Sequence, residues 1–357
     1  MNIYQAPSIV AAMLYRVASA RPAGLATGLV YNVSSPVMIG FARKNWFMLG
    51  LAGVAVLAVA DSSGLSVAPG IWLGAHRGAD ATIVLIFFLS GIALDARQIR
   101  KGLTDYPGTL LALALIFGIA PVLAMAFALL PLATGIVLGL YLVAVMPSTL
   151  SSGVVMTGSA GGNMAHALLI TIIANALAVV TIPVSLDLLA GARDDIRVAA
   201  FDQLAIMLKI AGFVLLPLLG GIVLRNHLSW LCRPLLPHIG TVNQIAILVI
   251  VWMAMCSCRA AIVAELDTLG TVIGVVFFFH LITIVIALLV TNIAGMNKGR
   301  RESVVFMGGQ KTLALSVVLQ LSLFPDYAIA LVVCVIHHIV HLIMDAFLVG
   351  YLREKKE

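Results

Sequence analysis

The chain has 357 residues, of which 62% are hydrophobic and only 10% are charged, and its mean hydropathy is +1.12. A soluble domain carries about 25% charged residues, so a chain this apolar must use lipid as its solvent. The net charge of +6 lies at the ends of predicted helices and forms no basic stripe, which excludes nucleic acid as a partner. The four cysteines lack a metal-binding spacing, so the sequence predicts neither a metal site nor a cofactor.

Apolar runs of helix length predict about ten membrane-spanning helices joined by short connections that contain Gly, Pro or Asp. The fold class is therefore an all-α polytopic membrane protein. The predicted spans cover residues 45–60, 79–95, 107–130, 134–158, 164–190, 202–225, 239–258, 269–293, 302–323 and 327–351.

Lysine and arginine divide unevenly between the two sides of this arrangement. With the N-terminus placed in the cytoplasm, the inside segments hold Arg43, Lys44, Arg97, Arg100, Lys101, Arg225, Arg233, Lys298, Arg300, Arg301, Arg353, Lys355 and Lys356. The outside segments hold only Arg77, Arg193, Arg197 and Arg259. This positive-inside bias predicts a plasma (inner) membrane protein with both termini in the cytoplasm.

Residues 1–40 contain no Asp or Glu and are interrupted by three prolines, Pro7, Pro22 and Pro36. We expect them to form a poorly ordered N-terminal extension outside the main bundle. A transit peptide and a translation start at Met38 are two further interpretations. The rest of the chain divides into a first repeat (41–190), a second repeat (198–351) and a cytoplasmic tail (352–357).

Two predicted spans are interrupted near their middle by polar residues. In the fourth span, Pro147 removes a backbone donor, and the hydroxyls that follow can satisfy freed backbone groups or bind a ligand. In the ninth span, a lysine follows a glycine pair, and a charge at the centre of a membrane helix is costly. The candidate residues at these interruptions are Ser148, Thr149, Ser151, Ser152 and Thr157 in the fourth span, and Gly308, Gly309, Gln310, Lys311 and Thr312 in the ninth.

The two interruptions occupy corresponding places. Val155 and Thr312 are 157 residues apart, and the same offset carries Trp46 to Gln203. Five spans precede residues 191–197 and five follow, and an odd number per half forces the halves into opposite orientations. Matched interruptions in inverted halves are typical of a transporter's binding site. Two kinks that merely aid packing are the alternative.

Several segments resemble the bile acid:sodium symporter (BASS) superfamily, in its SBF-like branch, over nearly all of residues 43–353. The resemblance implies two inverted five-helix repeats divided into a panel and a core, with the fourth and ninth helices discontinuous and crossing at their unwound centres. The segments that carry it are Arg43–Phe47, Phe87–Gly91, Met146–Thr157, Gly161–Asn163 and Gly309–Leu313.

In sodium-coupled members of that superfamily, two Na⁺ ions are held behind the crossing by oxygen ligands. By position, the family's Ser-Asn pair falls near Ser152 and Gly153, one residue out of register. Further ligands are matched by Asn163, Thr171 and Gln310, and Asn175 shares a helix face with Thr171. Other ligand positions carry Ala167, Phe306 and Ile116. Key Na⁺ ligands are therefore absent, although Na⁺ stays open as a coupling ion.

Lys311 adds a cation where the resemblance implies a lost carboxylate. We hypothesise that its ammonium replaces one coupling ion electrostatically, so that transport is independent of Na⁺ at that site or coupled to protons through Lys311. The alternative is that Lys311 snorkels to an interface or pairs with a carbonyl.

Three histidines lie in the tenth predicted span, and His337 and His341 are one helical turn apart. This spacing suggests a proton relay coupled to Lys311, whereas neutral histidines that only pack are the competing interpretation. Asp345 lies four residues after His341 and does not complete a metal site. For His166 and His280, which stand singly, core packing is the expectation.

The predicted function is a carrier for a small organic anion, such as a bile acid, a steroid sulfate or a carboxylate, that works by alternating access. The alternative is a non-transporting membrane regulator of ion homeostasis that acts through a partner. No enzymatic activity is expected, since Ser151 and Ser152 have no histidine or aspartate companion in their segment. The sequence does not indicate an oligomeric state.

Overall fold

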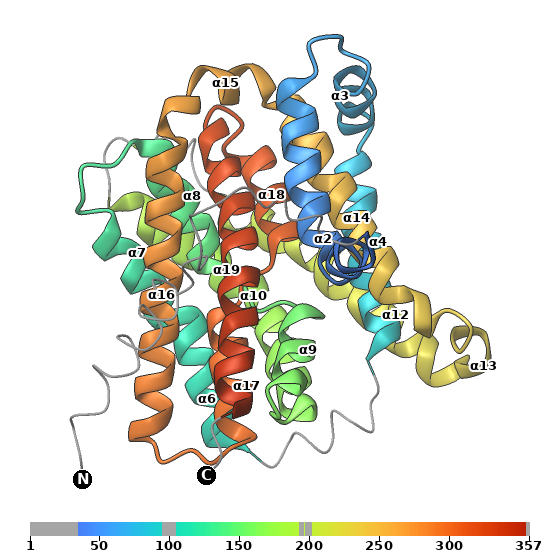
Figure 1. The fold of residues 1–357 in the computed structure, drawn as a ribbon, viewed down its shortest axis with the longest axis vertical. Coiled ribbons are helices and arrows are strands. Elements are labelled where there is room, and N and C mark those ends of the chain that lie inside the picture. Colours follow the sequence, from blue (N-terminus) through green and yellow to red (C-terminus); the bar gives the residue numbers. More distant parts are fainter. Residues whose placement is uncertain (1–34, 95–104, 193–195, 197–201, 355–357) are drawn as a thin grey trace, which may run out of the picture. The chain divides into compact units, whose positions relative to one another are not determined.

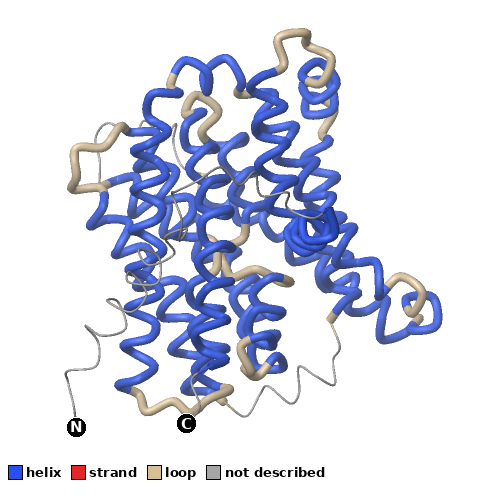
Figure 2. Tube along the Cα trace, in the orientation of Figure 1, coloured by secondary structure: helices blue, strands red, loops and turns tan. Residues whose placement is uncertain are grey.

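The computed structural model describes residues 35–94, 105–192, 196 and 202–354. Every regular element in these ranges is a helix, and they contain no strand (Figure 2). The chain divides into two units, Met1–Trp46 and Phe47–Glu357, and the account below concerns the second. Residues 1–34 of the predicted extension and 355–357 of the predicted tail lie outside the described residues.

The helices follow the predicted ranges in chain order (Figure 1). The first half contains α2 (Ser35–Ala60), α3 (Val67–Ala75), α4 (Gly78–Ala93), α6 (Tyr106–Ala114), the π-turn η2 (Leu115–Ile119), α7 (Ala120–Phe127), α8 (Thr134–Val145), α9 (Ser152–Ser159) and α10 (Met164–Gly191). The second half contains α11 (Gln203–Ile210), the π-turn η3 (Ala211–Leu215), α12 (Leu216–His227), α13 (Ser229–Cys232), α14 (Leu236–Ser257), α15 (Arg259–Ala264), η4 (Leu266–Thr268), α16 (Leu269–Ile293), α17 (Arg300–Gly309), α18 (Leu313–Leu323) and α19 (Ala328–Glu354).

Seven helical stretches among the described residues are long and apolar enough to cross a membrane. An eighth results if α3 and α4, which meet at an angle of 77°, form one span. Two shorter apolar helices, Trp46–Ala60 and Thr134–Val145, match the first predicted span and the first half of the interrupted fourth. The number of complete crossings, ten, stays a prediction.

Some boundaries differ from those predicted. Helices α3, α13 and α15 were not expected, and α19 continues into the predicted tail as far as Glu354. Helix α14 begins at Leu236 instead of residue 239 because a proline stands in its first turn, where the missing N–H has no intrahelical partner to lose.

The helices of Phe47–Glu357 form two groups that touch through α18 and through the packing of α10 on α11 and η3. In one group, α4 packs against α12 and α14, and α3 packs against α14. In the other, α19 packs against α8 and α16, while α17 packs against α6, α10 and α16. Helix α18 contacts α4 and α14 of the first group as well as α8 and α19 of the second.

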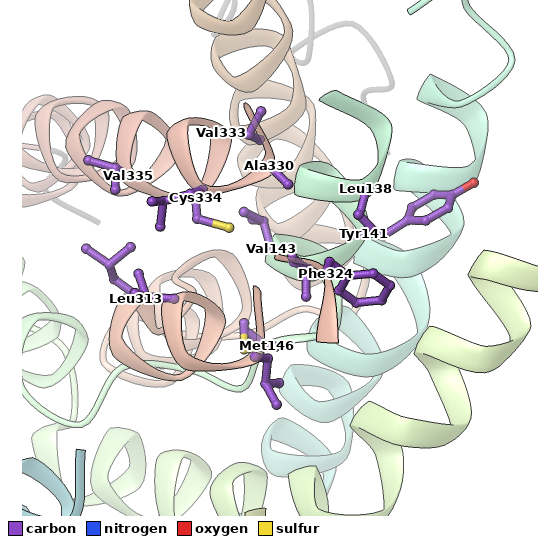
Figure 3. Packing of buried hydrophobic residues seen from close by; sticks show 14 of the residues in the cluster. Leu138, Tyr141, Val143, Met146, Leu313, Phe324, Ala330, Val333, Cys334 and Val335 are labelled. Carbon is purple, nitrogen blue, oxygen red and sulfur yellow. The ribbon is translucent and has the colours of Figure 1, made fainter. Parts of the chain in front are cut away.

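The packing of α8 on α19 is close because α8 presents glycines to it. A Cβ atom added to Gly139 would lie 2.5 Å from Cβ of Val333. Small residues at such positions let helix backbones approach each other in a membrane protein. Figure 3 shows the buried side chains around this contact, among them Leu138 and Val143 of α8, Leu313 of α18 and Cys334 of α19.

Candidate functional site

The two interrupted helices meet at their interruptions. Helix α8 ends at Val145 and α9 begins at Ser152, while α17 ends at Gly309 and α18 begins at Leu313. The N–H of Thr312 donates to the carbonyl of Pro147 at 3.0 Å, so the connections 146–151 and 310–312 are in direct contact. These two connections are called the crossing below.

The backbone leaves the helical conformation for a different reason on each side of the crossing. Met146 is extended (φ −68°, ψ 145°) because it precedes a proline, which disfavours the α region for its neighbour. In the other connection, Gln310 and Thr312 are extended, whereas the glycine pair lies inside the last turn of α17. A Cβ atom on Gly308 would lie 2.7 Å from Cδ1 of Leu115, so this glycine serves close packing and not the break itself.

Lys311 is buried, with 3% of its surface exposed. Its Nζ donates to the carbonyls of Ile116 and Ala144 at 2.8 Å and of Met146 at 3.1 Å. An ammonium has three donors, and all three are used. Two of the acceptors lie at the C-terminal end of α8, where the helix dipole favours a cation. The snorkelling alternative is therefore wrong, and the pairing with carbonyls is what the structure contains.

The carbonyl of Ile116 is free to accept a hydrogen bond from Lys311 because it lies in the π-turn η2, between α6 and α7. The N–H of Ala120 donates to Leu115, five residues back. Pro121, the next residue that could serve Ile116, has no N–H. The carbonyl is thus left without a helical partner inside the membrane, where an unsatisfied group costs free energy, and Lys311 supplies the missing donor.

Gln310 connects the crossing to a polar cluster behind it. Its Oε1 accepts from the hydroxyls of Thr149 at 2.9 Å and Ser152 at 3.0 Å, and those two hydroxyls lie 2.9 Å apart. Its Nε2 donates to Oδ2 of Asp345 in α19 at 2.7 Å. The side chain is fully buried among these partners.

Asp345 gathers histidines from two helices. Its Oδ1 lies 3.1 Å from Nε2 of His280 in α16, and its Oδ2 lies 3.7 Å from Nδ1 of His341. Nε2 of His341 lies 2.9 Å from Nδ1 of His338. His337 makes ring contacts with His280 at 5.5 Å and His341 at 5.4 Å. All four rings and the carboxyl group are buried.

The other candidate residues fall into two sets. Thr171 and Asn175 of α10 donate to the carbonyl of Ser148, and so hold the first connection from behind. By contrast, Asn163 is exposed and caps α10 through the N–H groups of Ala165 and His166, away from the crossing. Of the remaining candidates, Ser148 and Thr157 are buried, and the hydroxyl of Thr157 donates to the carbonyl of Gly153 in its own helix. Ser151 and Thr312 are accessible.

Three positions that the resemblance matches to sodium ligands carry side chains without oxygen, and they lie in one apolar cluster. Ile116, Ala167 and Phe306 are buried together with Val154 and Val304. Na⁺ requires oxygen ligands, and aliphatic and aromatic side chains supply none. These residues therefore do not fit a sodium ion at that place.

A second polar cluster ties three helix N-termini together. Asp105 caps α6 by accepting from the N–H of Gly108, and it accepts from both Nε and Nη2 of Arg300, at the start of α17, at 2.6 Å. His166 of α10 lies 3.8 Å from the same carboxylate. The hydrogen bonds from Arg300 hold the pKa of Asp105 below its usual value. This cluster includes none of the predicted site residues.

Sequence reasoning missed the roles of His280 and Asp345. They lie on different helices, and no spacing along the chain relates them. The one signal was a carboxylate inside an otherwise apolar helix, which is expensive in a membrane and marks a functional position.

Comparison with known proteins identifies the family of this chain. The profile of the SBF-like CPA transporter family matches residues 45–354. The chain is 25% identical to a probable sodium/metabolite cotransporter, BASS4, of rice chloroplasts, over 90% of this chain and 78% of the relative. It is also 25% identical to sodium/bile acid cotransporter 7-B of Xenopus laevis, over 86% and 91%. An uncharacterized Pseudomonas aeruginosa protein, PA2026, is 30% identical over 69% of this chain and 75% of its own length. The chain therefore belongs to the SBF-like CPA transporter family and, with it, to the bile acid:sodium symporter superfamily.

Proposed function

We propose that the protein is a secondary transporter that carries a small organic anion across the membrane by alternating access. The observation that supports this most directly is the crossing, where two broken helices meet through the hydrogen bond from Thr312 to Pro147. Discontinuous helices with this arrangement place helix ends and free backbone groups where a solute can reach them.

The anion is expected at the N-terminal ends of α9 and α18. Both helices begin at the crossing, and neither Ser151 nor Thr312 caps its helix with its own side chain. The N–H of Gly153 donates to the hydroxyl of Thr149. The other first-turn N–H groups and the positive end of the helix dipole favour a carboxylate or a sulfate. Ser151 is exposed and Ser152 and Thr312 are half-buried, so their hydroxyls are available to such a group.

Lys311 supports the site electrostatically and not by direct contact. Its three donors are already occupied by carbonyls, so we assign it the place of one coupling ion, as a cation that is part of the chain. Transport is then independent of Na⁺ at that place, because the positions that would ligate the ion are apolar.

The membrane arrangement belongs to the same proposal. Ten spans in two inverted repeats, with both termini in the cytoplasm of a plasma (inner) membrane, agree with the positive-inside distribution of lysine and arginine. The panel would consist of α2, α4, α12 and α14, and the core of the helices around the crossing.

Uptake into proteoliposomes tests the proposal. Three labelled probes cover the anion classes: taurocholate, estrone 3-sulfate and pyruvate. Each is offered with Na⁺ or K⁺ outside, and with or without an inward proton gradient. We expect saturable uptake of at least one probe that persists when Na⁺ is replaced by K⁺, and that falls when Thr149 is changed to Val.

The opposite result has an equally clear meaning. If no probe is taken up, and none raises the melting temperature of the purified protein under any of these conditions, the transporter proposal is wrong. A membrane regulator that acts through a partner would then account for the loss of the sodium ligands. Binding stabilises a folded protein in proportion to ligand concentration over affinity, so the thermal measurement detects a ligand even without flux.

A further inference from the structure

The polar network behind the crossing joins one carboxylate to three imidazoles and one amide. Asp345 contacts Gln310 on one oxygen and His280 on the other, and His341 and His338 extend the network along α19. Every member is at most 4% exposed. Buried ionisable groups inside a membrane protein mark proton or ion pathways.

Several ring nitrogens in this network lack a partner. Among the described residues, Nδ1 of His280, Nε2 of His337 and Nδ1 of His341 are buried without a hydrogen bond. Buried polar atoms are nearly always paired, so atoms left free need an explanation. An imidazole with a free nitrogen can take up a proton there and release one from its other nitrogen.

The charged and titratable side chains around Asp345 come from three places. Helix α16 provides His280, and α19 provides His337, His338 and His341. The connection between α17 and α18 provides Lys311, whose ammonium is directed to carbonyls of η2 and of the α8 end. The nearby parts of α9 and its preceding connection provide only the hydroxyls of Thr149 and Ser152 and the thioether of Met156.

The amide of Gln310 has two orientations that fit the same space. In the structure its NH₂ faces Asp345, and its oxygen accepts from both hydroxyls. The exchange of the amide oxygen and nitrogen keeps the shape of the side chain. The two N–H groups would then donate to Thr149 and Ser152, and the amide oxygen would accept from a protonated Asp345.

We infer that Asp345 is a proton-binding site whose protonation reverses the Gln310 amide and turns the hydroxyls of Thr149 and Ser152 into donors for a bound anion. The inference rests on the proposed anion transport, to which it adds the coupling ion, a proton that travels with the anion. With Asp345 ionised, the hydroxyls of Thr149 and Ser152 both donate to Oε1 of Gln310. With Asp345 neutral, at least one hydroxyl proton is released.

The proton balance is simple. In this scheme a proton taken up from outside the network enters it at His338, the most exposed of its rings at 4%. His338 and then His341 each accept a proton on one nitrogen and release one from the other. The proton ends on Oδ2 of Asp345, so the cluster gains one proton, and no oxidant, metal or second reactant is needed.

Infrared difference spectroscopy of the purified wild-type protein tests the proton site without any substrate. We expect a carboxylic acid carbonyl band to appear on acidification, and to shift when aspartate is labelled with ¹³C. The band should be missing in Asp345→Asn and retained in Asp105→Asn, the matched variant of the half-buried carboxylate beside His166. No labelled band in the wild type, or a band that survives in Asp345→Asn, overturns the inference. The absence of a labelled band in the wild type overturns the inference by itself, so the test can fail even if a variant does not fold.

Anion binding tests the second half of the inference. If the protein binds the anion only when Asp345 is neutral, its affinity for taurocholate, estrone 3-sulfate or pyruvate falls about tenfold for each pH unit above the pH at which Asp345 loses its proton. Asp345→Asn should bind with an affinity independent of pH, because His280 orients the asparagine so that its NH₂ donates to the reversed Gln310. An unchanged pH dependence in that variant refutes the link to the anion.

The two proposals fail separately. A labelled Asp345 band without any anion binding would support the proton site and contradict the transport proposal. Anion binding without the band would support transport and overturn the proton site.

Discussion

Lys311 donates a hydrogen bond of 2.8 Å to the carbonyl of Ile116, a residue 195 positions earlier in the chain. The contact joins a lysine at one broken helix to a π-turn in another, and each explains the other. The π-turn and Pro121 leave a carbonyl without a donor, and the crossing brings an ammonium to it. A charge that would be costly in lipid is thereby surrounded by backbone oxygens.

Removal of the ammonium is expected to destabilise the protein. Lys311→Met leaves three buried carbonyls unpaired, at a cost of about 1–3 kcal/mol for each in the free energy of unfolding. Denaturation of the purified protein in detergent measures the loss. The matched variant Lys209→Met removes a lysine that donates to the hydroxyl of Ser322 and lies over the ring of Phe213, and it should change stability far less. Equal losses in the two variants would contradict the role given to Lys311.

A smaller replacement tests the idea that Lys311 stands for an ion. In Lys311→Ala, the carbonyls of Ile116, Ala144 and Met146 are left around an empty space, and such oxygens are ligands for a hard cation. We expect NaCl to raise the melting temperature of this variant more than choline chloride does, and to have no such specific effect on the wild type. Equal melting temperatures of the variant in NaCl and in choline chloride would show that Lys311 only pairs with carbonyls and does not stand for an ion.

Pro121→Ala is expected to rescue part of the loss in Lys311→Met. Alanine restores an N–H that can reach the carbonyl of Ile116, so the group no longer depends on the lysine. A double-mutant cycle on the free energy of unfolding measures this coupling. The double variant should be more stable than the sum of the single effects predicts. Additive effects would mean that the proline and the lysine do not share the carbonyl.

The sequence was enough to predict the long apolar helices and the two interruptions, whereas the crossing of the broken helices was implied only by the resemblance. Helix positions follow from apolar runs whose length is set by the membrane, and Pro147 marks one interruption directly. The other break was expected over Gly308–Thr312, and it falls in the second part of that range, at Gln310–Thr312. The glycine pair stays helical, and Gly308 serves the close contact with Leu115. A glycine that interrupts a helix and a glycine that allows close packing look the same in the sequence. Only the neighbour packed against it distinguishes the two roles.

The candidate site was predictable only where its residues lie at one of the two interruptions. Thr149, Ser152 and Gln310 come together as expected at the interruptions. Asn163, matched only by resemblance, instead caps α10. The link from Gln310 to Asp345 and His280 depends on how α16, α17 and α19 pack, and a pattern within one helix carries no information about that.

The hydroxyls at the crossing give a prediction about transport. Thr149→Val keeps the shape of the side chain but loses its contacts to Gln310 and to the N–H of Gly153. We expect this variant to take up less of whichever probe the wild type transports into proteoliposomes. Its melting temperature should show that it still folds. Ser159→Ala is the control, because that exposed hydroxyl only donates to Val155 within its own helix. Equal uptake by both variants would place the anion elsewhere.

The contact between α8 and α19 predicts a packing effect. Gly139→Ala adds a Cβ atom 2.5 Å from Cβ of Val333, and such overpacking costs about 1–3 kcal/mol in the free energy of unfolding. Gly240→Ala in α14 meets nothing within 4 Å, and should be neutral or stabilising because alanine favours a helix. Combination of Gly139→Ala with Val333→Ala should recover part of the loss. A harmless Gly139→Ala would mean that the helices are less closely packed than described.

The cluster of Asp105 and Arg300 predicts how stability depends on pH. Hydrogen bonds from Arg300 lower the pKa of Asp105 in the folded protein, below the value of about 3.9 expected when the chain is unfolded. A depressed pKa contributes stability that is complete above the unfolded value and is lost as the pH falls through the folded value. The melting temperature of the wild type should therefore fall on acidification below about pH 4.

Asp105→Asn isolates that contribution. Asparagine caps a helix about as well as aspartate, so the variant keeps the cap of α6 but loses the charge that Arg300 needs. Its melting temperature should be lower than that of the wild type near neutral pH, and the two curves should converge in acid. Asp202→Asn makes the same exchange at the cap of α11, without the arginine, and should follow the wild-type curve. Parallel curves for Asp105→Asn and the wild type would show that the ion pair contributes nothing, because solvent around the 43% exposed Arg300 would then have screened it.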